Sequence, residues 1–336
     1  MSSEVKLSVL DLAPVPEGSS PAEALRNSVE LVRLAEQLGY HRYWVAEHHN
    51  MPGIASSSPP VLIGHLASST ERIRLGSGGV MLPNHAPLVV AEQFGMLNAL
   101  HPGRIDLGLG RAPGTDQVTA HALRREASPA ADEFPRQLGE LIGFLDGGFP
   151  DDHPYRRITA VPGSGERPPI WLLGSSGYSA QLAGRLGLPF SFAHHFSGEN
   201  TVPALELYRS SFQPSPDLAA PYAMIGVSAF CADTEADARR MASSQGLSFL
   251  RLRSGRPGPL PSPEEAESYP YSELDRAVLA QRGADTVVGD PDAVASQLAE
   301  LVDRTGVQEL MVTTMAYDHD ARLRSYRLVA EALGRA

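Results

Sequence analysis

The sequence predicts a (β/α)₈ barrel, and three observations support this. Short apolar segments alternate with helical segments along the 336 residues, which indicates a parallel sheet. Eight such apolar segments can be distinguished. Glycines and polar residues gather directly after their C-terminal ends, which in a barrel share one mouth. A doubly wound open sheet is the alternative that the same alternation permits.

The expected strands are short and rich in Val, Ile, Leu and aromatic residues. They cover 6–11, 42–46, 73–83, 105–109, 170–173, 190–193, 223–231 and 309–313. The helices between them are expected from capping residues and from apolar residues at helical spacing. Ser20, Pro21 and Glu23 begin the first helix, and Gly39 ends it. The remaining helices are expected at 58–69, 87–100, 134–145, 179–186, 199–212, 234–249, 290–304 and 321–333.

The segment 251–282 interrupts this alternation because it is rich in Pro, Gly and Ser. A long loop inserted at a barrel mouth is often a lid. We therefore predict a single domain over residues 1–336, with 251–282 as a structureless lid or insertion.

Composition excludes several classes of function. Lys and Arg number 28 against 39 Asp and Glu, a formal charge of −11, which argues against nucleic acid and anionic membranes as partners. Cys231 is the single cysteine, so neither a disulfide framework nor a cysteine metal site is expected. The chain has no apolar run of membrane-spanning length, and its first residues lack the pattern of a signal peptide. A cytoplasmic protein is expected.

The strand 73–83 contains glycines at 76, 78 and 79. Paired glycines such as Gly78 and Gly79 mark either a bulge or turn, or a place where a flat group lies against the backbone. Both interpretations remain open on this stretch alone.

A second candidate site is the segment 174–179, Gly-Ser-Ser-Gly-Tyr-Ser, which joins a strand to a helix. Free N–H groups and the helix dipole make such a junction an anion site, and the hydroxyls of Ser176 and Ser179 add donors. Arg111 follows another strand and can bind a phosphate if it faces inward. A plain helix cap and a surface arginine are the alternatives.

Histidines follow two strands, at 48–49 and at 194–195. Neighbouring residues on a strand face opposite sides, so His48 and His49 cannot point at one centre, and no metal site is expected. One of them can act as a base or hydrogen-bond donor, and a structural role for each stays open. The larger apolar side chains nearby are expected in the core: Tyr43, Trp44, Met81 and Phe94.

Four stretches resemble one family, the luciferase-like flavin-dependent monooxygenases, which include bacterial luciferase and the alkane monooxygenases. They are WVAEHHN at 44–50, LGSGGVMLPNH at 75–85, RIDLGLGR at 104–111 and the stretch 171–196. The resemblance implies a (β/α)₈ barrel that binds reduced FMN (FMNH₂) at its mouth. It also implies a non-prolyl cis peptide at Gly78–Gly79 beneath the flavin ring, and His48 as the catalytic histidine. The implied phosphate site comprises Arg111, Ser175, Ser176, Gly177, Tyr178 and Ser179. Gly110 stands where luciferase has a reactive cysteine, so thiol chemistry and light emission are not expected.

The function implied by this resemblance is oxygenation of a small organic substrate. A separate flavin reductase would supply FMNH₂, which reacts with O₂ to give a C4a-hydroperoxide. Hydroxylation, epoxidation and Baeyer–Villiger oxidation, including natural-product tailoring, remain open. The family resemblance also implies a homodimer. Two alternatives remain: hydride transfer with the deazaflavin F420, and a non-catalytic flavin-binding protein.

Overall fold

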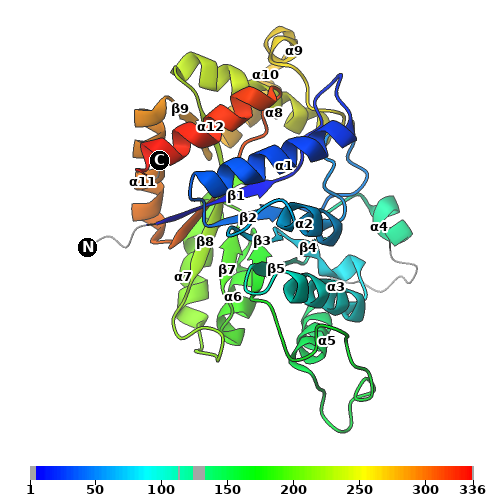
Figure 1. The fold of residues 1–336 in the computed structure, drawn as a ribbon. Helices are drawn as coiled ribbons and strands as arrows, with labels where there is room; N and C mark the ends of the chain where they lie inside the picture. The colour runs from blue at the N-terminus through cyan, green and yellow to red at the C-terminus, as the bar shows by residue number, and fades with distance from the viewer. Residues whose placement is uncertain (1–4, 113, 124–132, 335–336) are drawn as a thin grey trace.

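The computed structural model describes residues 5–112, 114–123 and 133–334, and these contain a closed parallel barrel (Figure 1). The ring runs β10-β1-β2-β3-β5-β6-β7-β8, and pairing of β8 with β10 closes it. The predicted barrel is therefore confirmed, and the open sheet is excluded. The strands are β1 Lys6–Asp11, β2 Arg42–Val45, β3 Arg74–Ser77, β4 Val80–Met81, β5 Ile105–Gly110, β6 Ile170–Gly174, β7 Phe190–Phe192, β8 Ala223–Cys231, β9 Thr286–Gly289 and β10 Glu309–Thr313.

Two features of the sheet depart from the predicted strands. The strand expected at 73–83 is divided into β3 and β4 at a cis peptide bond between Gly78 and Gly79, as the family resemblance implies. In addition, β9 pairs with the C-terminal half of β8 outside the ring. The sequence analysis missed β9 because its four residues follow directly on the segment 251–282.

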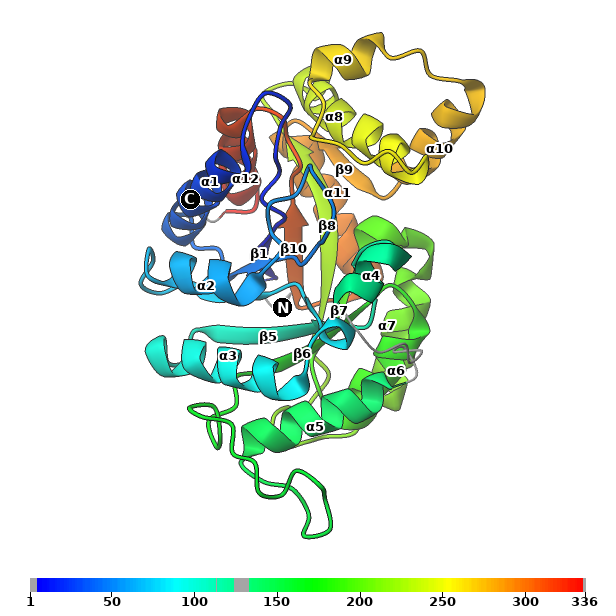
Figure 2. The same ribbon diagram turned by 90° about the vertical axis from the view of Figure 1, so that its right-hand side faces the viewer.

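Helices cover the outside of the barrel, as Figure 2 shows in side view. The first begins at Ser20, whose side chain accepts a hydrogen bond from the Glu23 N–H, as the capping residues predict. The helices are α1 Pro21–Gln37, α2 Pro59–Ala67, α3 Pro87–Leu100, α4 Gln117–Leu123, α5 Phe134–Asp146, α6 Gly177–Leu186, α7 Thr201–Ser211, α8 Glu235–Arg253, α9 Pro263–Ser268, α10 Glu273–Gly283, α11 Pro291–Thr305 and α12 His319–Ala332.

The prediction that 251–282 is structureless is wrong. This segment contains the end of α8, all of α9 and most of α10. Both new helices have side-chain caps: Ser262 accepts from the Glu265 N–H, and Ser272 forms a reciprocal capping box with Asp275. These capping signals are present in the sequence, but the Pro, Gly and Ser content of the connecting loops concealed them. That the segment acts as a lid stays a prediction.

The barrel interior contains, near the N-terminal ends of the strands, a buried charge cluster that the sequence analysis missed. Arg42 forms ion pairs of 2.7 Å with both Asp106 and Glu309, from three different strands. Its guanidinium carbon lies 4.8 Å from the centroid of the Trp171 ring. Asp106 also accepts hydrogen bonds from Arg74 and from the Trp44 indole N–H. Trp44, Tyr43 and Phe94 are fully buried, as expected.

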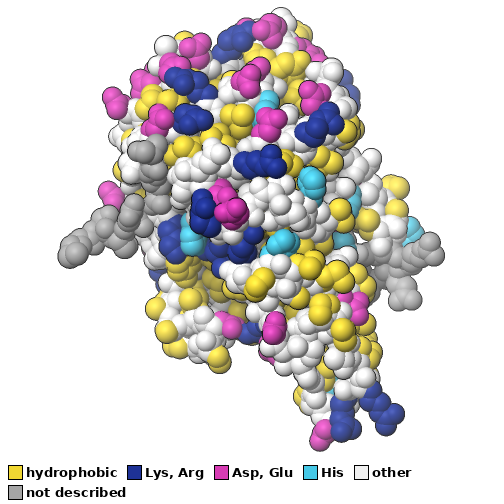
Figure 3. Space-filling view, viewed as in Figure 1, with side chains coloured by type: hydrophobic (Ala, Val, Ile, Leu, Met, Phe, Trp, Pro, Cys, Tyr) yellow, Lys and Arg dark blue, Asp and Glu magenta, His cyan; other side chains and the backbone are white. Residues whose placement is uncertain are grey.

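None of the helices in the described part of the chain is long and apolar enough to cross a bilayer. Acidic and basic side chains are interspersed on the upper part of the face that Figure 3 presents, where α8, α9 and α10 lie in the view of Figure 1.

Candidate active site

A cavity of about 450 Å³ lies at the C-terminal ends of the barrel strands. Residues that follow β1, β2, β3, β5, β6, β7 and β10 contribute to its wall, so it occupies the mouth predicted from the positions of the polar residues. Much of the lining is apolar, contributed by Leu10, Leu12, Met51, Ile54, Met311 and Met315. Met81 also lines this cavity, although its apolar side chain predicted a place in the core.

Gly78 and Gly79 line the cavity at the break between β3 and β4. A Cβ on Gly79 would lie 2.8 Å from the Gly108 carbonyl oxygen, and one on Gly78 would lie 2.6 Å from Leu10. Backbone contact within the barrel therefore requires glycine at position 79, whereas a Cβ at position 78 would meet the flexible end of the Leu10 side chain. Across the break, the Ser77 hydroxyl donates to the Gly108 carbonyl and accepts from its N–H. These two bonds hold β3 against β5 where the strand is interrupted.

One end of the cavity carries the residues predicted to bind an anion. Arg111, Ser175, Ser176 and Ser179 all line it. Gly177 begins α6, and Tyr178 contributes through its ring, whose centroid lies 4.3 Å from the Arg111 guanidinium carbon. Ser176 occupies the N-cap position without a side-chain hydrogen bond to the first turn. The structure thus brings a cation, three hydroxyls and a helix N-terminus together, the combination that binds phosphate groups.

His48 lines the same cavity, whereas His49 faces away from it and contacts Glu47. The two side chains point to different places, as predicted, but both residues lie in the loop after β2, which ends at Val45, so strand alternation is not the cause. Burial lowers the pKa of His48 to about 4, although the neighbouring Glu47 carboxylate raises it. The imidazole is therefore neutral at pH 7 and available to accept a proton.

Two buried polar atoms of the cavity wall lack a hydrogen-bond partner among the described residues: His48 Nδ1 and Thr313 Oγ1. Buried polar atoms are nearly always paired in native proteins. The two atoms therefore fit the polar edge groups of a ligand such as the flavin ring of FMN, and the apolar lining of the cavity fits its flat faces. Thr313 ends β10 and was not predicted as a site residue.

Glu47 organises the loop beneath His48, and the sequence analysis missed this role. Its buried carboxylate accepts hydrogen bonds from His85 Nε2 at 2.8 Å and His49 Nε2 at 2.9 Å, and from the Met81 N–H at 3.0 Å. Burial by itself would raise the pKa of Glu47, but these hydrogen bonds hold it below its ordinary value. Glu47 thereby ties the end of β2 to β4, next to Gly78–Gly79.

We expect Glu47→Gln to lower the free energy of unfolding by about 1 to 3 kcal/mol at pH 7, because an amide cannot accept from all three donors. A depressed pKa contributes stability that is present above the ordinary value of 4.5 and is lost as the pH falls through the folded value. The difference between wild type and variant, measured by urea unfolding, should therefore shrink below pH 4.5. Glu166→Gln, at an exposed position, is the control and should match wild type. A constant difference across this pH range would contradict the role of the charge.

His195 is a second histidine in the cavity wall that was not predicted as a site residue. Its Nδ1–H donates to the Gly226 carbonyl at 2.9 Å, so Nε2 is the acceptor in the neutral ring. Burial lowers its pKa to about 4. A Cβ at position 226 would lie 2.8 Å from the His195 ring, so glycine there makes room for it. The adjacent His194 contacts Thr201 instead; both histidines lie in a 3-10 helix, His194–Phe196, after β7 rather than on the strand.

The remaining wall comes from the segment between β8 and β10. Gln245, Ser248 and Phe249 of α8 and Arg282 of α10 line the cavity. None of these residues was predicted to line the cavity, because they lie far in sequence from the strand ends that mark the mouth. The described residues contain no group of three or more His, Cys, Asp or Glu side chains placed to hold a metal ion.

Comparison with known proteins adds a family and close relatives to this geometry. A family model described as luciferase-like monooxygenase matches residues 5–309. A luciferase-like monooxygenase of Escherichia coli (strain K12) is 51% identical over 97% of this chain and 96% of its own. The N-acetyl-S-alkylcysteine monooxygenase of Bacillus subtilis (strain 168) is 37% identical, with 98% of each chain covered. The crystal structure of apo-MsnO8 is 42% identical and superposes with a TM-score of 0.90 over 99% of both chains.

Proposed function

Because the chain belongs to the luciferase-like monooxygenase family, we propose that it uses reduced FMN and O₂ to oxygenate a small organic substrate. The enzyme is an oxidoreductase, as its monooxygenase relatives are. One observation carries the proposal of FMN. Gly78 and Gly79 line the same cavity as Arg111 and the N-terminus of α6, so one cavity has room for both a flat ring and a phosphate group.

The residues at the two ends of this cavity would bind different parts of FMN, the phosphate and the flavin ring. Arg111, Ser175, Ser176 and Ser179, with the first N–H groups of α6, would hold the phosphate. Gly78, Gly79 and the orphaned Thr313 hydroxyl would lie against the ring. Bound FMNH₂ supplies the electrons that activate O₂.

His48 would act on protons in this reaction. Its neutral imidazole, with Nδ1 unpaired in the cavity wall, can accept a proton or hold a hydrogen bond at that atom. The apolar side chains around it would exclude water from the reacting groups. A separate reductase would supply FMNH₂. The chemistry of the substrate would determine the type of oxygenation, which is hydroxylation, epoxidation or Baeyer–Villiger oxidation. The homodimer implied by the resemblance is part of the same proposal.

The phosphate site is tested by comparing FMN with riboflavin, which lacks the phosphate. We expect Arg111→Ala to weaken FMN binding by about 10- to 100-fold, the value of a charge-assisted hydrogen bond, and to leave riboflavin binding unchanged. Equilibrium titration followed by flavin fluorescence measures both affinities. Arg185→Ala, on the exposed side of α6, should behave as wild type. Equal FMN affinity in wild type and Arg111→Ala would contradict the assignment of Arg111 to the phosphate site.

The chemistry is tested by the requirement for O₂. Oxygenation needs a reductase, FMN and O₂ together, and yields product that carries an atom of O₂. Turnover with F420 in the absence of O₂ would instead identify a hydride-transfer enzyme. Tight FMN binding without product from any of a panel of substrates would identify a flavin carrier.

A further inference from the structure

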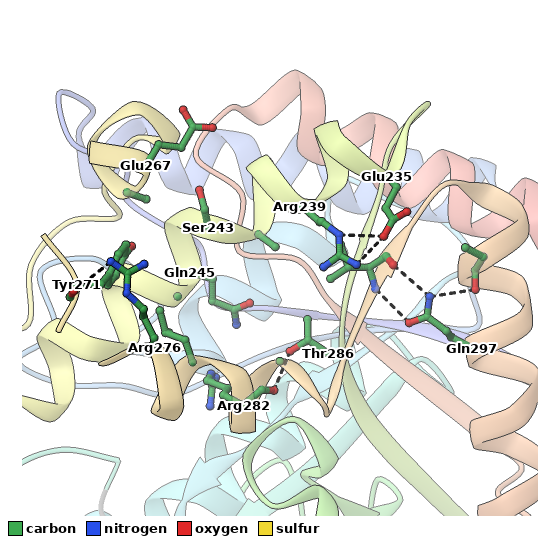
Figure 4. A pocket seen from close by; sticks show the side chains of 17 residues that line it. Glu235, Arg239, Ser243, Gln245, Glu267, Tyr271, Arg276, Arg282, Thr286 and Gln297 are labelled. Carbon is green, nitrogen blue, oxygen red and sulfur yellow. Dashed lines mark hydrogen bonds and ion pairs between the residues drawn. The ribbon is translucent and has the colours of Figure 1, made fainter. Parts of the chain in front are cut away.

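Arg282 lies where three cavities of the molecule meet. It lines the central cavity, an outer pocket of about 820 Å³ bounded by α8, α10 and β9, and a side pocket of about 660 Å³ beside the loop after β7. Figure 4 shows the outer pocket, with Arg282 and Gln245 on the side nearer the barrel. The two residues therefore form the partition between the outer pocket and the central cavity.

The Arg282 guanidinium has no hydrogen bond or ion pair with any residue in the described part of the chain. Its position is set by aromatic rings: the guanidinium carbon lies 4.1 Å from the centroid of Phe249 and 5.9 Å from that of Phe196. The acid that acts on it electrostatically is Asp285, whose carboxylate accepts the Gly198 N–H. Stacking leaves the edge of a guanidinium, with its N–H donors, available for a ligand.

The surroundings of Arg282 within the cavity are suited to an anion. The side-chain oxygen of Gln245 accepts the Ser228 hydroxyl at 2.9 Å, which leaves the NH₂ group of Gln245 as a donor. Among the described residues that line the cavity there is no Asp or Glu, whereas Arg111 and Arg282 are both present. The local field therefore favours negative charge.

Arg282 stands apart from the phosphate site. Arg111 follows β5 and the serines follow β6, whereas Arg282 comes from α10, which leads into β9 at the edge of β8. Figures 1 and 2 both show α10 well separated from α6. Arg282 is thus a second cation of the cavity wall, separate from the phosphate site.

We propose that Arg282, assisted by Gln245, binds an anionic group of the organic substrate, a carboxylate or a group of the same charge and shape. The proposal rests on the proposed function, in which FMN occupies the Arg111 end of the cavity. The planar guanidinium can bind a carboxylate through two parallel hydrogen bonds. The apolar wall of Leu12, Met51 and Ile54 would then receive the uncharged part of the substrate.

The test uses the FMN-loaded enzyme and two probes of equal length, hexanoate and hexanamide, with binding followed by the change in flavin absorbance. Wild type should bind hexanoate about 10- to 100-fold more tightly than hexanamide. Arg282→Gln should abolish this preference, and Arg282→Lys should retain part of it. Arg253→Gln is the matched control, because Arg253 also lies near the Phe249 ring, at 5.9 Å, but does not line the central cavity. FMN affinity should be the same in all four proteins.

Four results would overturn the inference while FMN still binds. They are equal affinity of wild type for the two probes, no saturable binding of hexanoate, an equal loss of both probes in Arg282→Gln, and weaker binding of reduced FMN in that variant. The third result would assign Arg282 to packing of the insertion, and the fourth would assign it to the flavin ring. Failure of wild type to bind FMN would instead refute the proposed function itself.

Discussion

Replacing His48 with Asn is expected to slow product formation by about 10²- to 10⁴-fold, the usual contribution of a positioned proton-transfer group, and so to lower the product formed per FMNH₂ consumed. His48 is the neutral imidazole of the cavity wall whose Nδ1 has no partner among the described residues. Asparagine keeps the polar character of the position but cannot accept a proton at a comparable pKa. The measurement is product yield in single-turnover mixing of the FMNH₂-loaded enzyme with O₂ and substrate.

The pH dependence follows from the same residue. Burial lowers the pKa of His48 to about 4, so the neutral form persists above that value and is lost as the pH falls through it. The yield of wild type should therefore not vary with His48 ionisation from pH 5 to 8. His65→Asn, on an exposed part of α2, is the control and should retain wild-type yield. A His48→Asn enzyme with normal yield and normal FMN affinity would remove His48 from the mechanism.

Substituting Asp106 with Asn should give the largest loss of stability, about 3 to 5 kcal/mol in the free energy of unfolding. The fully buried Asp106 carboxylate pairs with Arg42 and Arg74, and Arg42 itself is buried. Loss of the negative charge leaves Arg42 with Glu309 as its one anionic partner in the cluster. A buried cation that loses a partner carries an uncompensated desolvation cost. Urea denaturation at pH 7, followed by circular dichroism, measures the change.

An exposed ion pair provides the comparison for this effect. Asp233 pairs with Arg324 at the surface, where water screens the charges. Asp233→Asn should therefore unfold at the same urea concentration as wild type. If Asp106→Asn also unfolds like wild type, the charge cluster contributes nothing to the stability of the barrel.

The barrel could be predicted because its signal is repeated. Each strand is a short apolar run, each helix has caps or helical spacing, and the mouth is marked by residues that break both patterns. The cis peptide at Gly78–Gly79 was implied by the family resemblance alone. Barrel packing explains Gly79 itself, since a Cβ there would collide with the Gly108 carbonyl.

The charge cluster could not be predicted, since its members are far apart in the chain. Arg42 and Glu309 are separated by 267 positions, and only closure of the ring brings them together. A local signal did exist, because Asp106 interrupts an otherwise apolar strand and Arg42 and Glu309 begin two others. A charge within a buried strand requires a partner, so these positions could have been paired in principle.

The sequence located the cavity lining where residues follow strand ends, as His48, Arg111 and the serines do; their roles stay predictions. Glu47 was adjacent to a predicted residue, but its partner His85 is 38 positions away. Arg282 and Gln245 come from helices above the mouth, and strand positions carry no information about them. Their location depends on how α8 and α10 pack, which is a tertiary property.

The pairing of β9 with β8 has a consequence for how this protein can diversify. The chain leaves the sheet after Cys231 and re-enters it at Thr286, and β9 ends at Gly289, the direct ladder partner of Cys231. The segment 232–288 is therefore a cassette whose two flanking residues, Cys231 and Gly289, pair directly in the sheet. Exchange of this cassette between homologues would replace Gln245, Phe249 and Arg282 together while leaving the Arg111 and Gly78–Gly79 parts of the cavity untouched. Under the roles proposed above for Arg282 and Arg111, such an exchange would alter the choice of substrate independently of the choice of cofactor.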